Sequence, residues 1–179
     1  MLRISIIFIG ILFSLFSCTN DPVEVRKINS DIVLPVSSTK NVEMLYSDSA
    51  KLRAKIKAPQ RDTYIGENEY IEFTKGVDMI FYDADGKESG HMKAKYAISY
   101  NKKEQMIARN NVELWNAEGK RLDTEELIWD QKSGRIHSEK FSKITSPTEV
   151  IYGDGFESDQ DFSKYRIVNI SGIVSVKNE

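Results

Sequence analysis

The sequence contains few of the residue types on which most enzymes and metalloproteins depend. Its 179 residues include one cysteine, two histidines and four prolines. A single cysteine cannot form a disulfide within the chain, so a packed core or partners must stabilise the fold. His91 and His137 have no cysteine or second histidine at ligand spacing, so we expect no metal and no cofactor. No G-x-S-x-G, H-E-x-x-H or phosphate-cradling glycine motif occurs, so we predict no catalytic residue and no enzyme.

Excess positive charge and long apolar runs are also missing. The 25 Lys and Arg residues face 27 Asp and Glu residues, giving a net charge of −2. Proteins that bind nucleic acid concentrate positive charge on one face, so we expect no nucleic-acid partner. The main apolar run, residues 4–16, falls short of the about 20 residues that a transmembrane helix needs.

The first 18 residues have the organisation of an export signal. A basic start at Arg3 precedes the apolar run, and small residues follow it. The stretch Leu15-Phe16-Ser17-Cys18 resembles a lipobox, the bacterial pattern cut by signal peptidase II before a lipidated cysteine. The resemblance implies a signal peptide over residues 1–17 and lipid attachment at Cys18, which anchors the mature chain to a membrane. An ordinary signal peptide with an incidental cysteine, or a short uncleaved anchor, are the alternatives.

Beyond the signal, the pattern predicts a tether and one all-β domain. Residues 18–39 mix Asn, Asp, Pro and Ser without a sustained period, which is typical of a linker. Residues 40–179 suffice for one domain. Within them, Lys51–Ala58 and Met92–Tyr100 alternate polar and apolar side chains, the period of a strand with one buried face. No segment of ten or more residues has a helical period.

Glycine-containing turn signals separate these runs and indicate hairpins. They occur at Asp85-Gly86-Lys87, Glu118-Gly119-Lys120, Lys132-Ser133-Gly134 and Gly153-Asp154-Gly155. The chain also repeats itself, because Met79–Lys87 resembles Val112–Lys120. One hairpin of about 30 residues cannot bury its own apolar face, so stacked hairpins must share a core.

The order and spacing of several stretches carry a family resemblance. They are Val42–Ser47, Leu52–Ala58, Asn110–Trp115, Gly119–Asp130 and Ile151–Asp159. Together they resemble the OstA-like β-jellyroll family of lipopolysaccharide transport, and the chain as a whole resembles its LptC branch over about Val42 to Val174. The resemblance implies an open, twisted β-jellyroll whose apolar trough holds acyl chains.

The resemblance also implies a role and a location. The expected protein is a periplasmic carrier that takes lipopolysaccharide from an inner-membrane ABC transporter and passes it to a bridge protein of the same fold. It would lie on the periplasmic side of the envelope, with the inner membrane favoured over the outer. Better-known family members keep an uncleaved transmembrane helix, and here a lipobox stands in its place. The alternative is a surface or outer-membrane lipoprotein whose β-sandwich binds glycan or protein.

Strand alternation and the repeat select two sets of candidate site residues. The first set would line the trough: Leu52, Ala54, Ile56, Met79, Phe81, Met92, Ala94, Tyr96, Ile98, Val112 and Leu114. The second set lies in the β-branched C-terminal stretch and would form an edge that docks with the next jellyroll: Ile167, Ile170, Ile173, Val174 and Val176. Pairing of that stretch inside the domain is the alternative.

Overall fold

The computed structural model describes residues 34–67 and 69–175, so the lipobox with Cys18, and Val176, lie outside the described residues. This part of the chain is almost entirely antiparallel β-sheet, which confirms the all-β prediction. A 3₁₀ turn, η1 (Asn101–Lys103), interrupts it. The strands are β1 (Ser37–Asp48), β2 (Lys51–Tyr64), β3 (Tyr70–Phe73), β4 (Val77–Tyr82), β5 (Glu88–Ala94), β6 (Tyr96–Tyr100), β7 (Gln105–Asn116), β8 (Arg121–Asp130), β9 (Arg135–Thr145), β10 (Glu149–Asp159), β11 (Tyr165–Ile167) and β12 (Ile170–Ser175).

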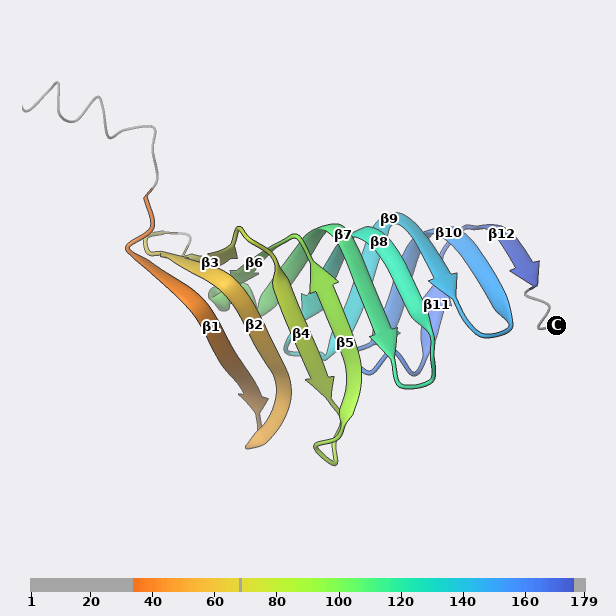
Figure 1. The fold of residues 1–179 in the computed structure, drawn as a ribbon, viewed down its shortest axis with the longest axis horizontal. Coiled ribbons are helices and arrows are strands. Elements are labelled where there is room, and N and C mark those ends of the chain that lie inside the picture. The colour runs from red at the N-terminus through yellow and green to blue at the C-terminus, as the bar shows by residue number, and fades with distance from the viewer. Residues whose placement is uncertain (1–33, 68, 176–179) are drawn as a thin grey trace, which may run out of the picture. The chain divides into compact units, whose positions relative to one another are not determined.

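The sheet folds over into two facing walls (Figure 1). Long strands run through both walls: β2 pairs with β4 through residues 54–57 and with β3 through residues 62–64. In the same way, β7 pairs with β6 through residues 105–109 and with β5 through residues 113–116. We call the layer that contains β4, β5 and β12 the first wall, and the layer that contains β3, β6 and β11 the second wall.

A crease separates the walls where the long strands bend. The β7–β8 register shifts between Arg109 and Val112, where Asn110 and Asn111 have φ of 64° and 60°. Asparagine tolerates this left-handed conformation better than most residues. On the next strands, the buried hydroxyls of Thr124 and Ser138 lie 3.1 Å apart, and Ser138 Oγ accepts the amide of Lys140. Side chains therefore satisfy polar groups that the interrupted ladder leaves free.

The turn predicted at Gly153-Asp154-Gly155 is wrong, because these residues lie inside β10 at the crease. A Cβ at Gly153 would lie 2.3 Å from the side chain of Ile167 and 2.7 Å from the carbonyl of Val168. The glycine is needed because the β11–β12 connection packs directly on the strand. The other three turn signals do connect hairpins, those of β4–β5, β7–β8 and β8–β9.

Candidate functional site

A continuous row of apolar side chains crosses the first wall. Pairing between strands sets its members side by side, from β1 at one end of the sheet to β12 at the other. We call this set the apolar row: Met44, Ile56, Met79, Met92, Leu114, Leu122, Ile144, Ile151 and Ile173. Successive side chains of a strand point to opposite faces of the sheet, and residues paired directly across neighbouring strands point to the same face. The side chains of the apolar row therefore all lie on one face, towards the second wall.

The neighbouring residues form a second row on the opposite face. We call it the charged row: Glu43, Lys57, Asp78, Lys93, Glu113, Asp123 and Lys143, which Tyr152 continues on β10. Lys57 Nζ lies 3.4 Å from Glu43, and Lys93 Nζ lies 3.5 Å from Asp78. Exposed pairs of this kind contribute little to stability. The charged side chains keep this face of the first wall in contact with water, while the apolar row faces the interior.

The second wall covers the middle of the apolar row. Trp129 of the second wall packs edge-on against Tyr46 and Phe81 of the first, with ring centroids 5.3 Å apart in both pairs. The two inner faces form one buried cluster, so the interior is filled by side chains along most of its length.

Most of the predicted trough residues lie in this interior. Eight of them belong to the buried cluster: Ala54, Ile56, Met79, Phe81, Met92, Ala94, Val112 and Leu114. Leu52 lies on the same face of β2 near the end of the strand and is half-buried.

Tyr96 and Ile98 lie outside the interior cluster, so their predicted orientation is wrong, although Ile98 is buried on its own side of the sheet. The alternation from Met92 to Tyr100 is broken at Lys95, where the chain passes from β5 in the first wall to β6 in the second. Ala97 and Ser99 then pair with Phe73 and Ile71 on the inner side. Tyr96 points outward and donates a 2.6 Å hydrogen bond to Glu72. Burial and this hydrogen bond raise the pKa of the Tyr96 hydroxyl.

The interior residues of the second wall were missed by sequence reasoning. They include Ile71, Phe73, Ala97, Met106, Ala108, Leu127, Trp129, Ile136 and Phe156, and Phe162 of the β10–β11 connection joins them. The signal was ambiguous because several outward neighbours, such as Ile107 and Ile128, are apolar too. Alternation does not identify the inner face of a strand when both faces carry apolar residues.

Hollows of different sizes accompany the walls. A cavity of about 280 Å³ opens into the interior near β1, between Met44 and Ile56 of the first wall and Ile71 and Phe73 of the second. A larger hollow of about 900 Å³ lies at the crease, where Lys57, Asp78 and Lys93 of the charged row line it together with Ala58, Val77 and Ala94 of the buried cluster. Met44 and Ile56 belong to the apolar row, so the cavity of about 280 Å³ continues this row.

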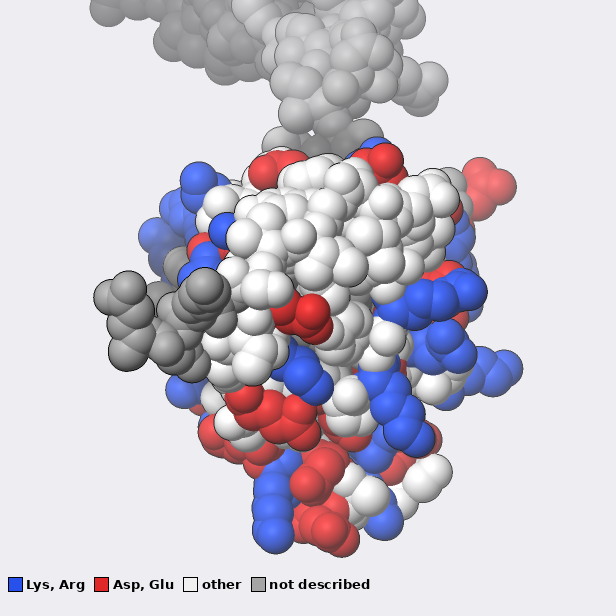
Figure 2. All heavy atoms as spheres, turned by 90° about the vertical axis from the view of Figure 1, so that its right-hand side faces the viewer, with Lys and Arg blue, Asp and Glu red and all other residues white. Residues whose placement is uncertain are grey.

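The C-terminal end of the first wall exposes apolar side chains. The β12 strand pairs with β10, as the alternative prediction had it, and its other edge is unpaired among the described residues. Ile170, Ile173 and Val174 are each more than half exposed, whereas Ile167 packs against the core. Figure 2 looks onto this end and shows a broad uncharged area. The strand carries no charged residue over Ile170–Ser175 to discourage pairing with another strand.

Over residues 34–67 and 69–175, no three His, Cys, Asp or Glu side chains are grouped so that they could hold a metal ion. Nor is any helix there long and apolar enough to span a membrane.

Comparison with models of protein families shows to which family the chain belongs. The family model described as "Lipopolysaccharide-assembly, LptC-related" matches residues 2–174, nearly the whole chain. The chain belongs to this LptC family. No curated protein matches it significantly. Membership links the chain to lipopolysaccharide transport and to the cell envelope, in agreement with an apolar interior built on a two-walled antiparallel sheet.

Proposed function

We propose that the chain is a lipid-anchored periplasmic carrier. It receives lipopolysaccharide from the inner-membrane ABC transporter and passes it to a bridge protein of the same fold. The observation that carries this proposal is the apolar row, which runs across nine strands and ends in exposed side chains at β12. Acyl chains gain about 0.8 kcal/mol for each CH₂ that leaves water, so such a path suits a lipid whose sugars stay outside.

The exposed end supports hand-over to a second jellyroll. A strand added beside β12 would pair with its free edge and continue the apolar row beyond Ile173. The exposed side chains of Ile170, Ile173 and Val174, within the uncharged surface of Figure 2, give such a partner apolar groups to cover. The energy for directional movement would come from the transporter.

Transfer in a reconstituted system tests the carrier role. In proteoliposomes that hold the ABC transporter, the chain should acquire labelled lipopolysaccharide only when ATP is present. Acquisition that is equal with and without ATP would show that the transporter does not supply the chain. Failure to acquire any lipopolysaccharide would remove the carrier role altogether.

The anchor is tested separately. Cys18→Ala should leave the precursor uncleaved and abolish labelling by fatty acid. If the variant is still processed at the same place and still labelled, Cys18 is not the site of attachment.

A further inference from the structure

The connection between β10 and β11 bridges the two walls at the side opposite the crease. We call residues Asp159–Lys164 the strap. It leaves the second wall and contacts the first, where Ser89 Oγ donates a 2.9 Å hydrogen bond to Asp161, and Asn116 Nδ2 donates a 2.8 Å bond to the carbonyl of Phe162. Gln160 Nε2 also donates to the carbonyl of Tyr82 at 3.4 Å. These contacts close the interior along the ends of β4, β5 and β7.

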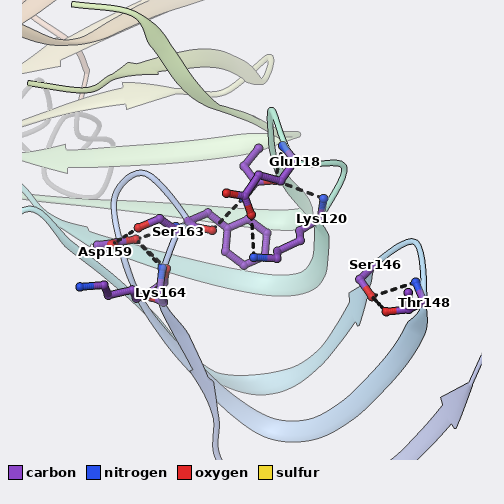
Figure 3. A network of polar contacts seen from close by, with 10 residues as sticks. Glu118, Lys120, Ser146, Thr148, Asp159, Ser163 and Lys164 are labelled. Carbon is purple, nitrogen blue, oxygen red and sulfur yellow. Dashed lines mark hydrogen bonds and ion pairs between the residues drawn. The ribbon is translucent and has the colours of Figure 1, made fainter. Parts of the chain in front are cut away.

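The strap is a compact turn that holds its own shape. The Asp159 carboxylate accepts hydrogen bonds from the amide of Ser163 at 2.8 Å, from its hydroxyl at 2.6 Å and from the amide of Lys164 at 3.3 Å (Figure 3). Burial would raise the pKa of Asp159, but these hydrogen bonds outweigh it and lower the pKa. Such a turn can move away from the first wall without losing its internal bonds.

Phe162 is the part of the strap that enters the interior. Its side chain is fully buried and lies edge-on to Phe156 and Tyr165, with ring centroids 5.5 Å away in both pairs. The backbone of Phe162 has a φ of 51°, a conformation that bulky residues rarely adopt. The fold therefore holds an unfavourable backbone conformation at a residue whose ring is buried in the interior cluster, against Phe156 and Tyr165.

The strap is attached to the first wall by side-chain hydrogen bonds and not by strand pairing. Among the described residues, no backbone ladder joins the strap to β4, β5 or β7. By contrast, β7 and β8 pair along both of their halves. Separating the strap from the first wall breaks far fewer bonds than separating two strands.

We infer that the space filled by Phe162 is an acyl-chain site, and that an acyl chain enters it as the strap leaves the first wall. This inference rests on the proposed carrier function and assigns it a particular place. Phe162 is an apolar group of the chain itself, held where the two inner faces meet and where a lipid tail would be sheltered. A cargo that binds only the open form shifts the strap towards that form.

A covalent bridge between the strap and the first wall tests the inference. Ser89→Cys with Asp161→Cys, in the full chain carrying Cys18→Ser, allows the walls to be bridged through the strap by oxidation or by a short bis-thiol reagent, with the bridge verified by mass. The bridged protein should bind labelled lipopolysaccharide at least ~10-fold more weakly than its unbridged form, because the open fraction is removed. Equal binding by both forms would overturn the inference.

A matched bridge within one wall provides the control. Glu43 and Lys57 are paired neighbours on β1 and β2, so Glu43→Cys with Lys57→Cys can be bridged without joining the walls. This bridge should leave binding unchanged. An equal loss in both bridged proteins would also overturn the inference, since the loss would not belong to the strap. If unbridged proteins and the wild type bind no lipopolysaccharide, the carrier function itself fails.

A third variant tests the acyl-chain site separately from the movement of the strap. Phe162→Ala in the unbridged chain vacates the ring's space, so an acyl chain no longer has to displace the ring. A labelled single-chain fatty acid should then bind the unbridged Phe162→Ala protein more tightly than the unbridged protein that keeps Phe162. If vacating the space does not strengthen binding, the site assigned to the acyl chain is wrong.

Discussion

The middle and the C-terminal end of the apolar row use the same kind of residue in the same kind of strand, yet differ in exposure. Leu114, Leu122 and Ile144 are buried, Ile151 is half-buried and Ile173 is 58% exposed. All lie on the same face and pair antiparallel. What changes is the cover, because the second wall lies over the middle and not over the end. The middle therefore stabilises the fold, while the end is free to meet lipid or a partner.

Shortening one side chain to alanine in the middle of the apolar row and one at its end should distinguish the stabilising role from the binding role. Leu114→Ala should lower the free energy of unfolding by about 2–5 kcal/mol, since it leaves a cavity in a packed interior. Ile173→Ala should change it by no more than about 0.5 kcal/mol. Urea denaturation of the two variants measures both values. A cost at Ile173 that equals the cost at Leu114 would show that the end is covered after all.

The strap that closes the middle should weaken in acid. Because the folded-state pKa of Asp159 is lowered, its contribution is fully present above the unfolded value of about 3.9 and is lost as pH falls through the folded value. At neutral pH, Asp159→Asn should cost about 1–2 kcal/mol. The difference between wild type and variant should shrink below about pH 4. Unfolding curves at several pH values measure it, and a pH-independent difference would contradict the assignment.

A charge on the free edge should affect binding but not folding. Val174→Lys places a lysine on β12, where charge discourages the addition of a strand. Its free energy of unfolding should change by no more than about 0.5 kcal/mol. Binding to the downstream bridge protein should fall by roughly tenfold or more, about 1.4 kcal/mol. Ile65→Lys is the control, because Ile65 is also exposed but lies outside the strands. Equal effects of the two lysines on binding would remove β12 as the docking edge.

The first wall could be predicted from the sequence because its outer face is charged. In Lys51–Ala58, Leu52, Ala54 and Ile56 each lie between two charged residues, which predicts that they face inward. The same reasoning gave Met92 and Ala94. It failed after Lys95, where the chain changes walls and the next residues are apolar on both faces.

The strap and the crease could not be predicted, because they depend on contacts between distant segments. Asn116 and Phe162 meet across 46 positions of sequence. The glycines at Gly153 and Gly155 suggested a turn, yet they accommodate a later segment of the chain that packs on β10. Local patterns report the period and the turn residues, but not which wall a segment will cover.

Photocrosslinking of lipopolysaccharide from positions in the apolar row and in the charged row tests the central claim most directly. A photoreactive amino acid is placed in living cells at Met44, Ile151 or Ile173 of the apolar row, and at Glu43 or Lys143 of the charged row. Lipopolysaccharide should be captured from the first three positions and not from the last two. Capture from both rows alike, or from the charged row alone, would contradict transport along the apolar row.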